Sequence, residues 1–189
     1  TSPEGTKLLG RLPVAFVPNL GQWEHRASYV ARFGAMTVFL QDKGWTFTLA
    51  ERGDSEPASV PPMAARAREG REPKPAQGRG VAVRMSFVGA NAPALAAEQQ
   101  LPGRHNYFLG NDPSKWRSDV PLYASVRYRG LHDGVDVRAR EHDGHFEYDL
   151  LLQPGADLEP LEIVVEGSDG LRIDREGTLV ITTALGPVQ

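Results

Sequence analysis

The 189-residue chain contains no cysteine, which excludes disulfide bonds, thiolate metal sites and a cysteine nucleophile. It also has no apolar run near the roughly 20 residues that a membrane-spanning helix needs. Its 21 basic and 24 acidic residues give a net charge of −3, without the excess positive charge typical of nucleic-acid binding. We therefore expect neither a nucleic-acid partner nor insertion into a membrane.

Sequence motifs of common enzyme classes are missing as well. The chain has no G-x-S-x-G nucleophile elbow, and it has no phosphate-binding loop that precedes a helix. No catalytic residue can be assigned from such motifs. We therefore expect a protein without enzymatic activity.

Glycine and proline are present in excess, and they separate runs of alternating polarity. The 20 Gly and 15 Pro make up 35 of 189 residues, or about 19%, against a usual share of about 12%. From Val81 to Phe87, apolar residues occupy the odd positions, and small or polar residues occupy the even ones. Similar alternation occurs in residues 45–49, 146–152, 161–165 and 179–181. A period of two is typical of strands with one buried face.

This pattern predicts the fold class. We expect an all-β protein, an antiparallel β-sandwich or partly open barrel of roughly ten to twelve short strands, with little helix. Asp112–Trp116 is the exception, because an N-cap residue followed by proline predicts one short helical turn.

One segment, Glu51–Gly80, differs from the rest in composition. It has no aromatic residue, contains five prolines and alternates charges of opposite sign. Such a segment cannot bury enough apolar surface to offset the entropy of ordering it. We predict a flexible loop or linker at this place, within a single domain that comprises residues 1–189.

The densest polar stretch runs from His132 to Asp149. If residues 141–144 form a hairpin loop, Arg138 lies opposite Glu147, and Asp136 lies opposite Asp149. The two aspartates would repel each other unless a cation lies between them. That cation could be an arginine of the preceding strand, Arg127 or Arg129, or a Ca²⁺ ion held by Asp136 and Asp149.

The same residues are candidates for ligand binding. Paired carboxylates such as Glu147 with Asp136 or Asp149 can hydrolyse glycosidic bonds. The tryptophans, Trp23 and Trp116 above all, could stack on sugar rings, although burial in the core is the commoner role. The candidate ligand-binding residues are therefore Asp136, Glu147, Asp149, Trp116 and Trp23.

Three blocks of the sequence suggest a family. They are Val17–Gln22 (VPNLGQ), Gly103–Pro121 (GRHNYFLGNDPSKWRSDVP) and Gly130–Asp157, which contains FEYDLLLQPGAD. Together they resemble the N-terminal domain of unknown function of bacterial SBBP-repeat (β-propeller repeat) surface proteins. His132–Val135 departs from the aromatic-Pro-Gly-Ile pattern of that family, whereas Asp136 matches it.

The resemblance implies an exported module ahead of a repeat region, with no assigned enzymatic activity. It implies a secreted or cell-surface location, a mature form without a signal peptide, and the downstream repeats or another surface protein as partner. Because family members continue into further strands, we expect this chain to be truncated at its C-terminus.

The leading hypothesis is a non-catalytic exported β-module that supports assembly or adhesion at the bacterial surface. One alternative is a carbohydrate-binding module that binds a glycan, either alone or together with a Ca²⁺ ion. A second alternative is a glycan hydrolase that uses the paired carboxylates.

Overall fold

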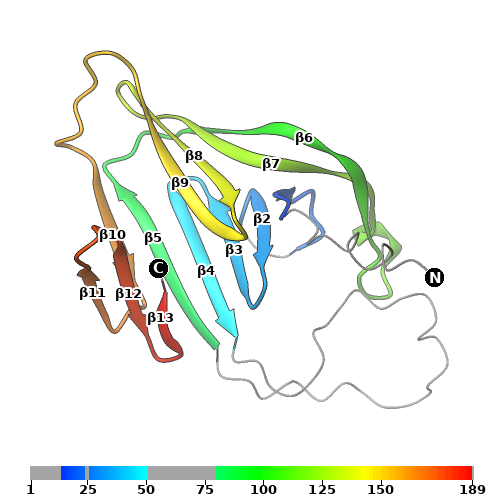
Figure 1. Ribbon diagram of the computed structural model, residues 1–189. Helices are drawn as coiled ribbons and strands as arrows, with labels where there is room; N and C mark the ends of the chain where they lie inside the picture. Colours follow the sequence, from blue (N-terminus) through cyan, green and yellow to red (C-terminus); the bar gives the residue numbers. More distant parts are fainter. Residues whose placement is uncertain (1–13, 24–25, 51–79, 189) are drawn as a thin grey trace, which may run out of the picture.

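The computed structural model describes residues 14–23, 26–50 and 80–188, and its regular structure is almost entirely β-strand (Figure 1). Thirteen strands form three antiparallel sheets in a sandwich-like arrangement, which does not close into a barrel within the described residues. The predicted all-β class is confirmed. The structure has slightly more strands than the expected ten to twelve. The excess comes from very short strands such as β1 and β13, which have only two and three residues. The prediction for 51–80 lies outside the described residues, apart from the first residue of β5.

The strands follow the alternating runs of the sequence. They are β1 (Val17–Pro18), β2 (Tyr29–Phe33), β3 (Met36–Gln41), β4 (Gly44–Ala50), β5 (Gly80–Val88), β6 (Ala94–Tyr107), β7 (Arg117–His132), β8 (Val135–His142), β9 (His145–Leu152), β10 (Glu162–Glu166), β11 (Gly170–Ile173), β12 (Leu179–Thr183) and β13 (Gly186–Val188). Within the described residues, no helix is long and apolar enough to cross a membrane.

The largest sheet has six strands in the order β1-β2-β3-β4-β5-β10. Its central strand β4 places Trp45 opposite Leu40 of β3 and Met85 of β5. Strand β10 returns late in the chain to pair with β5, so that Ile163 lies opposite Phe87. The second sheet, β6-β7-β8-β9, packs over this one, and the small sheet β11-β12-β13 lies beside β5 and β10 (Figure 1).

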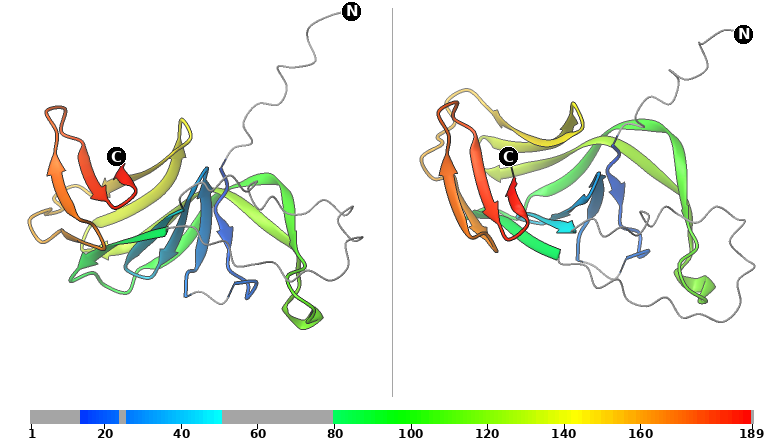
Figure 2. Two further views of the ribbon diagram at one scale, coloured as in Figure 1. Left: turned by 90° about the horizontal axis from the view of Figure 1, so that it is seen from below. Right: turned by 60° about the horizontal axis from the view of Figure 1, so that its bottom comes forward.

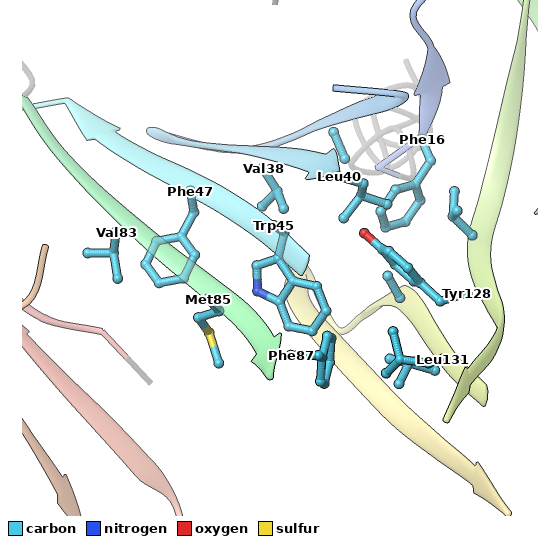
Figure 3. Packing of buried hydrophobic residues seen from close by; sticks show 14 of the residues in the cluster. Phe16, Val38, Leu40, Trp45, Phe47, Val83, Met85, Phe87, Tyr128 and Leu131 are labelled. Carbon is cyan, nitrogen blue, oxygen red and sulfur yellow. The ribbon is translucent and has the colours of Figure 1, made fainter. Parts of the chain in front are cut away.

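The main core lies where the three sheets meet, and Trp45 is at its centre (Figure 3). The Trp45 side chain is fully buried, and its ring centroid lies 5.3 Å from that of Phe87 and 5.0 Å from that of Tyr148. Tyr128 is buried beside it and donates its hydroxyl hydrogen to the Gly44 carbonyl at 2.9 Å. Burial raises the pKa of Tyr128 well above its ordinary value, so the hydroxyl remains a donor at neutral pH.

A smaller core lies under the long β6–β7 hairpin and contains Val17, Val120 and Leu122. Next to it, the backbone N–H and C=O of Phe16 bond with Tyr123 of β7 at 2.8 and 3.0 Å. Because β1 also pairs with β2, this segment connects the six-stranded sheet to the four-stranded sheet.

The end of the β6–β7 hairpin projects from the rest of the described fold (Figure 2). It contains the 3₁₀ turn η1 (Pro113–Lys115), and the Asp112 carboxylate accepts the Ser114 N–H at its start. The predicted helical turn is therefore confirmed, with the expected cap.

Candidate functional site

Charged side chains cover the outer face of the four-stranded sheet. In β8, alternation buries Val137 and Ala139 and directs Asp136, Arg138 and Arg140 to the other face. Strand β9 adds two carboxylates to this face, Glu147 and Asp149, through their pairing with the β8 arginines. These side chains form a network of ion pairs, described below as the charged face.

The Asp149 carboxylate is shared by two arginines. Its Oδ2 accepts from Arg138 Nη2 at 2.8 Å and from Arg140 Nε at 2.8 Å. Arg140 also lies 2.8 Å from Glu147. Hydrogen bonds from Arg140 and then Arg138 lower the pKa of Asp149, so this carboxylate is ionised at neutral pH.

Asp136 has partners of its own. Its Oδ2 lies 2.7 Å from Arg127 Nη2 and 2.9 Å from Arg127 Nε. Its Oδ1 accepts the backbone N–H of Gly130 at 2.6 Å. The expectation that an arginine of the preceding strand neutralises Asp136 is therefore confirmed for Arg127.

The predicted hairpin loop of residues 141–144 is wrong. Strands β8 and β9 are joined by a two-residue turn, Asp143–Gly144, and both residues have positive φ, 50° and 84°. Asp-Gly with two positive φ angles is the two-residue turn that matches the twist of a hairpin. The shorter turn moves the register by two residues relative to the prediction.

The observed register changes which charges meet. Arg138 lies opposite Asp149 rather than Glu147, and Asp136 lies opposite Leu151 rather than Asp149. The predicted repulsive pair of aspartates therefore does not form. Each aspartate binds arginine instead.

Asp149 provides a test of the charged face. Replacing it with asparagine (Asp149→Asn) leaves two arginines without their shared ion pair, and we expect the free energy of unfolding to fall by about 1–2 kcal/mol at pH 7. Because the pKa of Asp149 is lower in the folded chain, its stabilisation is present above the pKa of the unfolded chain. It is lost as the pH falls through the folded pKa. Urea unfolding at several pH values should therefore show a shallower acid slope for the variant.

Asp133→Asn is the matched control, because Asp133 is exposed in the β7–β8 turn. We expect this variant to unfold with the free energy of the wild type at pH 7. Equal losses in both variants would show that the Asp149 network does not stabilise the fold.

The charged face was also the predicted calcium site. Among the residues that the structure describes, no group of three or more His, Asp or Glu side chains could hold a metal ion. Asp136 and Asp149 lie on the same strand pair, but arginines occupy their carboxylates. Calcium binding at these two residues stays a prediction.

The three tryptophans have different environments. Trp45 is in the main core, and Trp23 is half-buried with its ring 5.1 Å from that of Tyr107. Trp116 is 40% exposed at the end of the β6–β7 hairpin. The five candidate residues therefore fall into two groups, one on the charged face and one near the hairpin end.

Large apolar side chains are exposed around Trp116. Phe108 is 61% and Leu109 is 49% exposed, and the Phe108 and Trp116 rings meet edge to face at 5.4 Å. Leu20, 51% exposed, lies in the neighbouring loop after β1. These four residues are termed the apolar tip. Sequence reasoning missed Phe108 and Leu109, although consecutive apolar residues before a Gly-Asn-Asp-Pro turn cannot all face a core.

Arg117 fixes the backbone of the apolar tip. Its Nε donates to the Leu20 carbonyl at 2.6 Å, and its Nη1 donates to the carbonyls of Ser114 and Trp116 at 2.7 and 2.8 Å. The Trp116 Nε1 donates to the Gly110 carbonyl at 3.3 Å. The exposed rings are therefore held in place by hydrogen bonds within the hairpin and its neighbouring loop.

The comparisons with known proteins bear on the family. A family model described as a domain of unknown function, DUF7948, matches residues 16–189. Searches of the curated proteins and of the solved structures gave no match. Since the family model spans nearly the whole chain, including the charged face and the apolar tip, the chain belongs to the DUF7948 family.

Proposed function

We propose that the chain is a non-catalytic, exported β-module of a bacterial surface protein with SBBP repeats, where it supports assembly or adhesion. The observation that carries this proposal is the apolar tip. Grouped, exposed apolar side chains on a folded domain are typical of a contact surface. The three sequence blocks that resemble the N-terminal domains of such surface proteins support the bacterial and exported setting.

The charged face supports a role without catalysis. General acid–base chemistry needs a carboxyl group with a pKa near the working pH and room to reach a substrate. Asp149 has a lowered pKa, and Asp136 and Glu147 bind arginines. These contacts support a stabilising role for the charged face over a catalytic one.

A second candidate function is carbohydrate binding at Trp116. The exposed indole ring of Trp116 favours it, because aromatic faces stack on the apolar faces of sugar rings. Phe108 stands almost perpendicular to this ring, at 76°. The two rings therefore form a corner, which would take one sugar ring rather than a flat row of sugars.

Cosedimentation with isolated bacterial envelopes tests the proposal. We expect saturable binding of the wild-type chain, a roughly tenfold weaker affinity for Phe108→Ala, and no release of reducing sugar. Ile173→Ala is the matched control, because Ile173 is a large apolar residue that is 72% exposed on β11, away from the tip.

Two results would overturn the proposal. The first is a wild-type chain that does not bind envelopes. The second is release of reducing sugar that a Glu147→Gln variant abolishes, which would identify a glycan hydrolase.

A further inference from the structure

We infer that the apolar tip docks the chain on the interfacial region of a lipid bilayer that contains anionic headgroups. This inference rests on the proposed function, since it names the surface to which the tip binds. It concerns peripheral docking, in which side chains enter the interfacial region from one side, and to that extent it departs from the expectation that the chain does not insert into a membrane.

The shape and composition of the tip fit a soft, deformable surface. The hairpin end is convex and projects from the fold (Figure 2), so the tip inserts into a partner and does not receive one. The loop that contains the exposed Leu20, almost 90 residues away in sequence, is held beside the hairpin end by the hydrogen bond from Arg117 to the Leu20 carbonyl. Tryptophan and phenylalanine with leucine are the side chains by which peripheral segments enter the headgroup–acyl boundary.

Several polar groups of the hairpin end bond within the hairpin and its neighbouring loop. Arg117 binds three carbonyl oxygens, and Asp112 Oδ1 accepts both the N–H and the Oγ–H of Ser114 at 3.0 and 2.7 Å. The backbone of η1 adds bonds from Lys115 N–H to Asp112 O and from Trp116 N–H to Pro113 O, both 3.1 Å. Polar groups that leave water must be paired in this way.

The same pairing disfavours a sugar. A sugar site needs polar side chains beside the aromatic ring that are free to bond hydroxyl groups. Near Trp116, three such groups, Asp112 Oδ1, Trp116 Nε1 and the Arg117 guanidinium, bond within the hairpin and its neighbouring loop instead. The leucines of the tip also offer no ring for stacking.

The charge of the hairpin end complements anionic headgroups. It carries three basic residues and two acidic ones, Arg104, Lys115, Arg117, Asp112 and Asp119, which leaves an excess of one positive charge. Arg104 and Asp119 lie 3.5 Å apart as a pair. Arg117 forms no ion pair with a carboxylate among the described residues, because its N–H groups face carbonyls. Basic residues beside an apolar segment strengthen binding to anionic leaflets.

Vesicle cosedimentation tests the inference. The probes are phosphatidylcholine vesicles with and without phosphatidylglycerol, and intact peptidoglycan sacculi. We expect the chain to bind the anionic vesicles, more weakly at high salt and more weakly without phosphatidylglycerol. Phe108→Ala and Trp116→Ala should each weaken binding by about tenfold or more, since each removes a large apolar side chain from the interface.

Two variants control this experiment. Ile173→Ala removes an equally exposed apolar residue elsewhere and should bind like the wild type. Trp116→Phe keeps an apolar ring and should retain binding, but it should lose the blue shift of tryptophan fluorescence that vesicles induce. Thermal unfolding of each variant verifies that it is folded.

Two outcomes overturn the inference. One is the absence of vesicle binding, and the other is an equal loss for Ile173→Ala. A third result would separate the inference from the proposed function. If the chain binds sacculi but not vesicles, and Trp116→Ala abolishes that binding, the ligand is a glycan; the inference then fails while the proposed role in adhesion remains. If neither envelopes nor vesicles are bound, the proposed function fails together with the inference.

Discussion

Replacing Trp45 with alanine is expected to lower the free energy of unfolding by about 3–5 kcal/mol, or to prevent folding altogether. The Trp45 ring is fully buried and contacts the rings of Phe87, Tyr128, Phe146 and Tyr148, which come from both large sheets. Truncation to alanine would leave a cavity. The neighbouring side chains could not fill it, because the strands that carry them are held by hydrogen bonds to other strands. Chemical unfolding followed by far-ultraviolet circular dichroism measures the loss.

Trp116→Ala is the matched control for this prediction. The chemical change is the same, but Trp116 is 40% exposed and packs mainly against Phe108. We expect a loss of less than about 1 kcal/mol, as for most surface substitutions. If both variants lost equal stability, Trp45 would not be the centre of the core.

The Trp45 indole nitrogen shows how the core tolerates a polar atom. Trp45 Nε1 is buried and has no hydrogen-bond acceptor among the described residues. Aromatic rings surround the indole, with the Phe146 centroid at 5.4 Å and an interplanar angle of 65°. The packing of these rings therefore offsets the stability that is lost because the Trp45 N–H has no acceptor in the described part of the chain.

Alternating polarity was sufficient to predict which residues of a strand are buried. In Val81–Phe87, Val83, Met85 and Phe87 are core residues, as the period of two requires. Which strands pair with one another could not be predicted from the sequence. Strand β10 pairs with β5 across four intervening strands, and no local signal specifies such a contact. The division into three sheets follows from such long-range choices.

Local turn chemistry contained a signal that was misread. The Asp143–Gly144 pair between two alternating runs is the strongest short-range indication of a two-residue hairpin turn. The predicted four-residue loop displaces every cross-strand pair by two residues from the observed register. Because two is the period of a strand, the outer face kept its residues. Asp136, Glu147 and Asp149 were therefore assigned to the correct face with the wrong partners.

The apolar tip was the largest omission. Sequence reasoning selected Trp116 for its chemistry, but exposure of Phe108 depends on the hairpin end projecting beyond both sheets. Arg117 reaches a carbonyl of the loop after β1, a contact between residues 97 positions apart. Only the three-dimensional fold brings these segments together.

Gly167→Ala is expected to be about as damaging as the loss of Trp45, at about 3–5 kcal/mol. Gly167 lies between β10 and β11, where the chain passes from the six-stranded sheet to the three-stranded sheet. Its φ is 83°, and a Cβ atom there would lie 2.3 Å from the carbonyl oxygen of Ala82 in β5. That oxygen belongs to a strand paired on both sides, so it cannot move without disturbing the β4–β5 and β5–β10 ladders.

Gly177→Ala separates the two causes of the stability loss expected for Gly167→Ala, which are the positive φ and the close contact with the Ala82 carbonyl. Gly177 has nearly the same φ, 87°, but nothing lies within 4 Å of an added Cβ atom. Its variant should lose only the roughly 1 kcal/mol of a left-handed alanine. Thermal unfolding of both variants therefore measures the steric contribution as their difference. Equal losses would mean that backbone conformation alone requires glycine at 167, and that close contact with β5 does not position the three-stranded sheet.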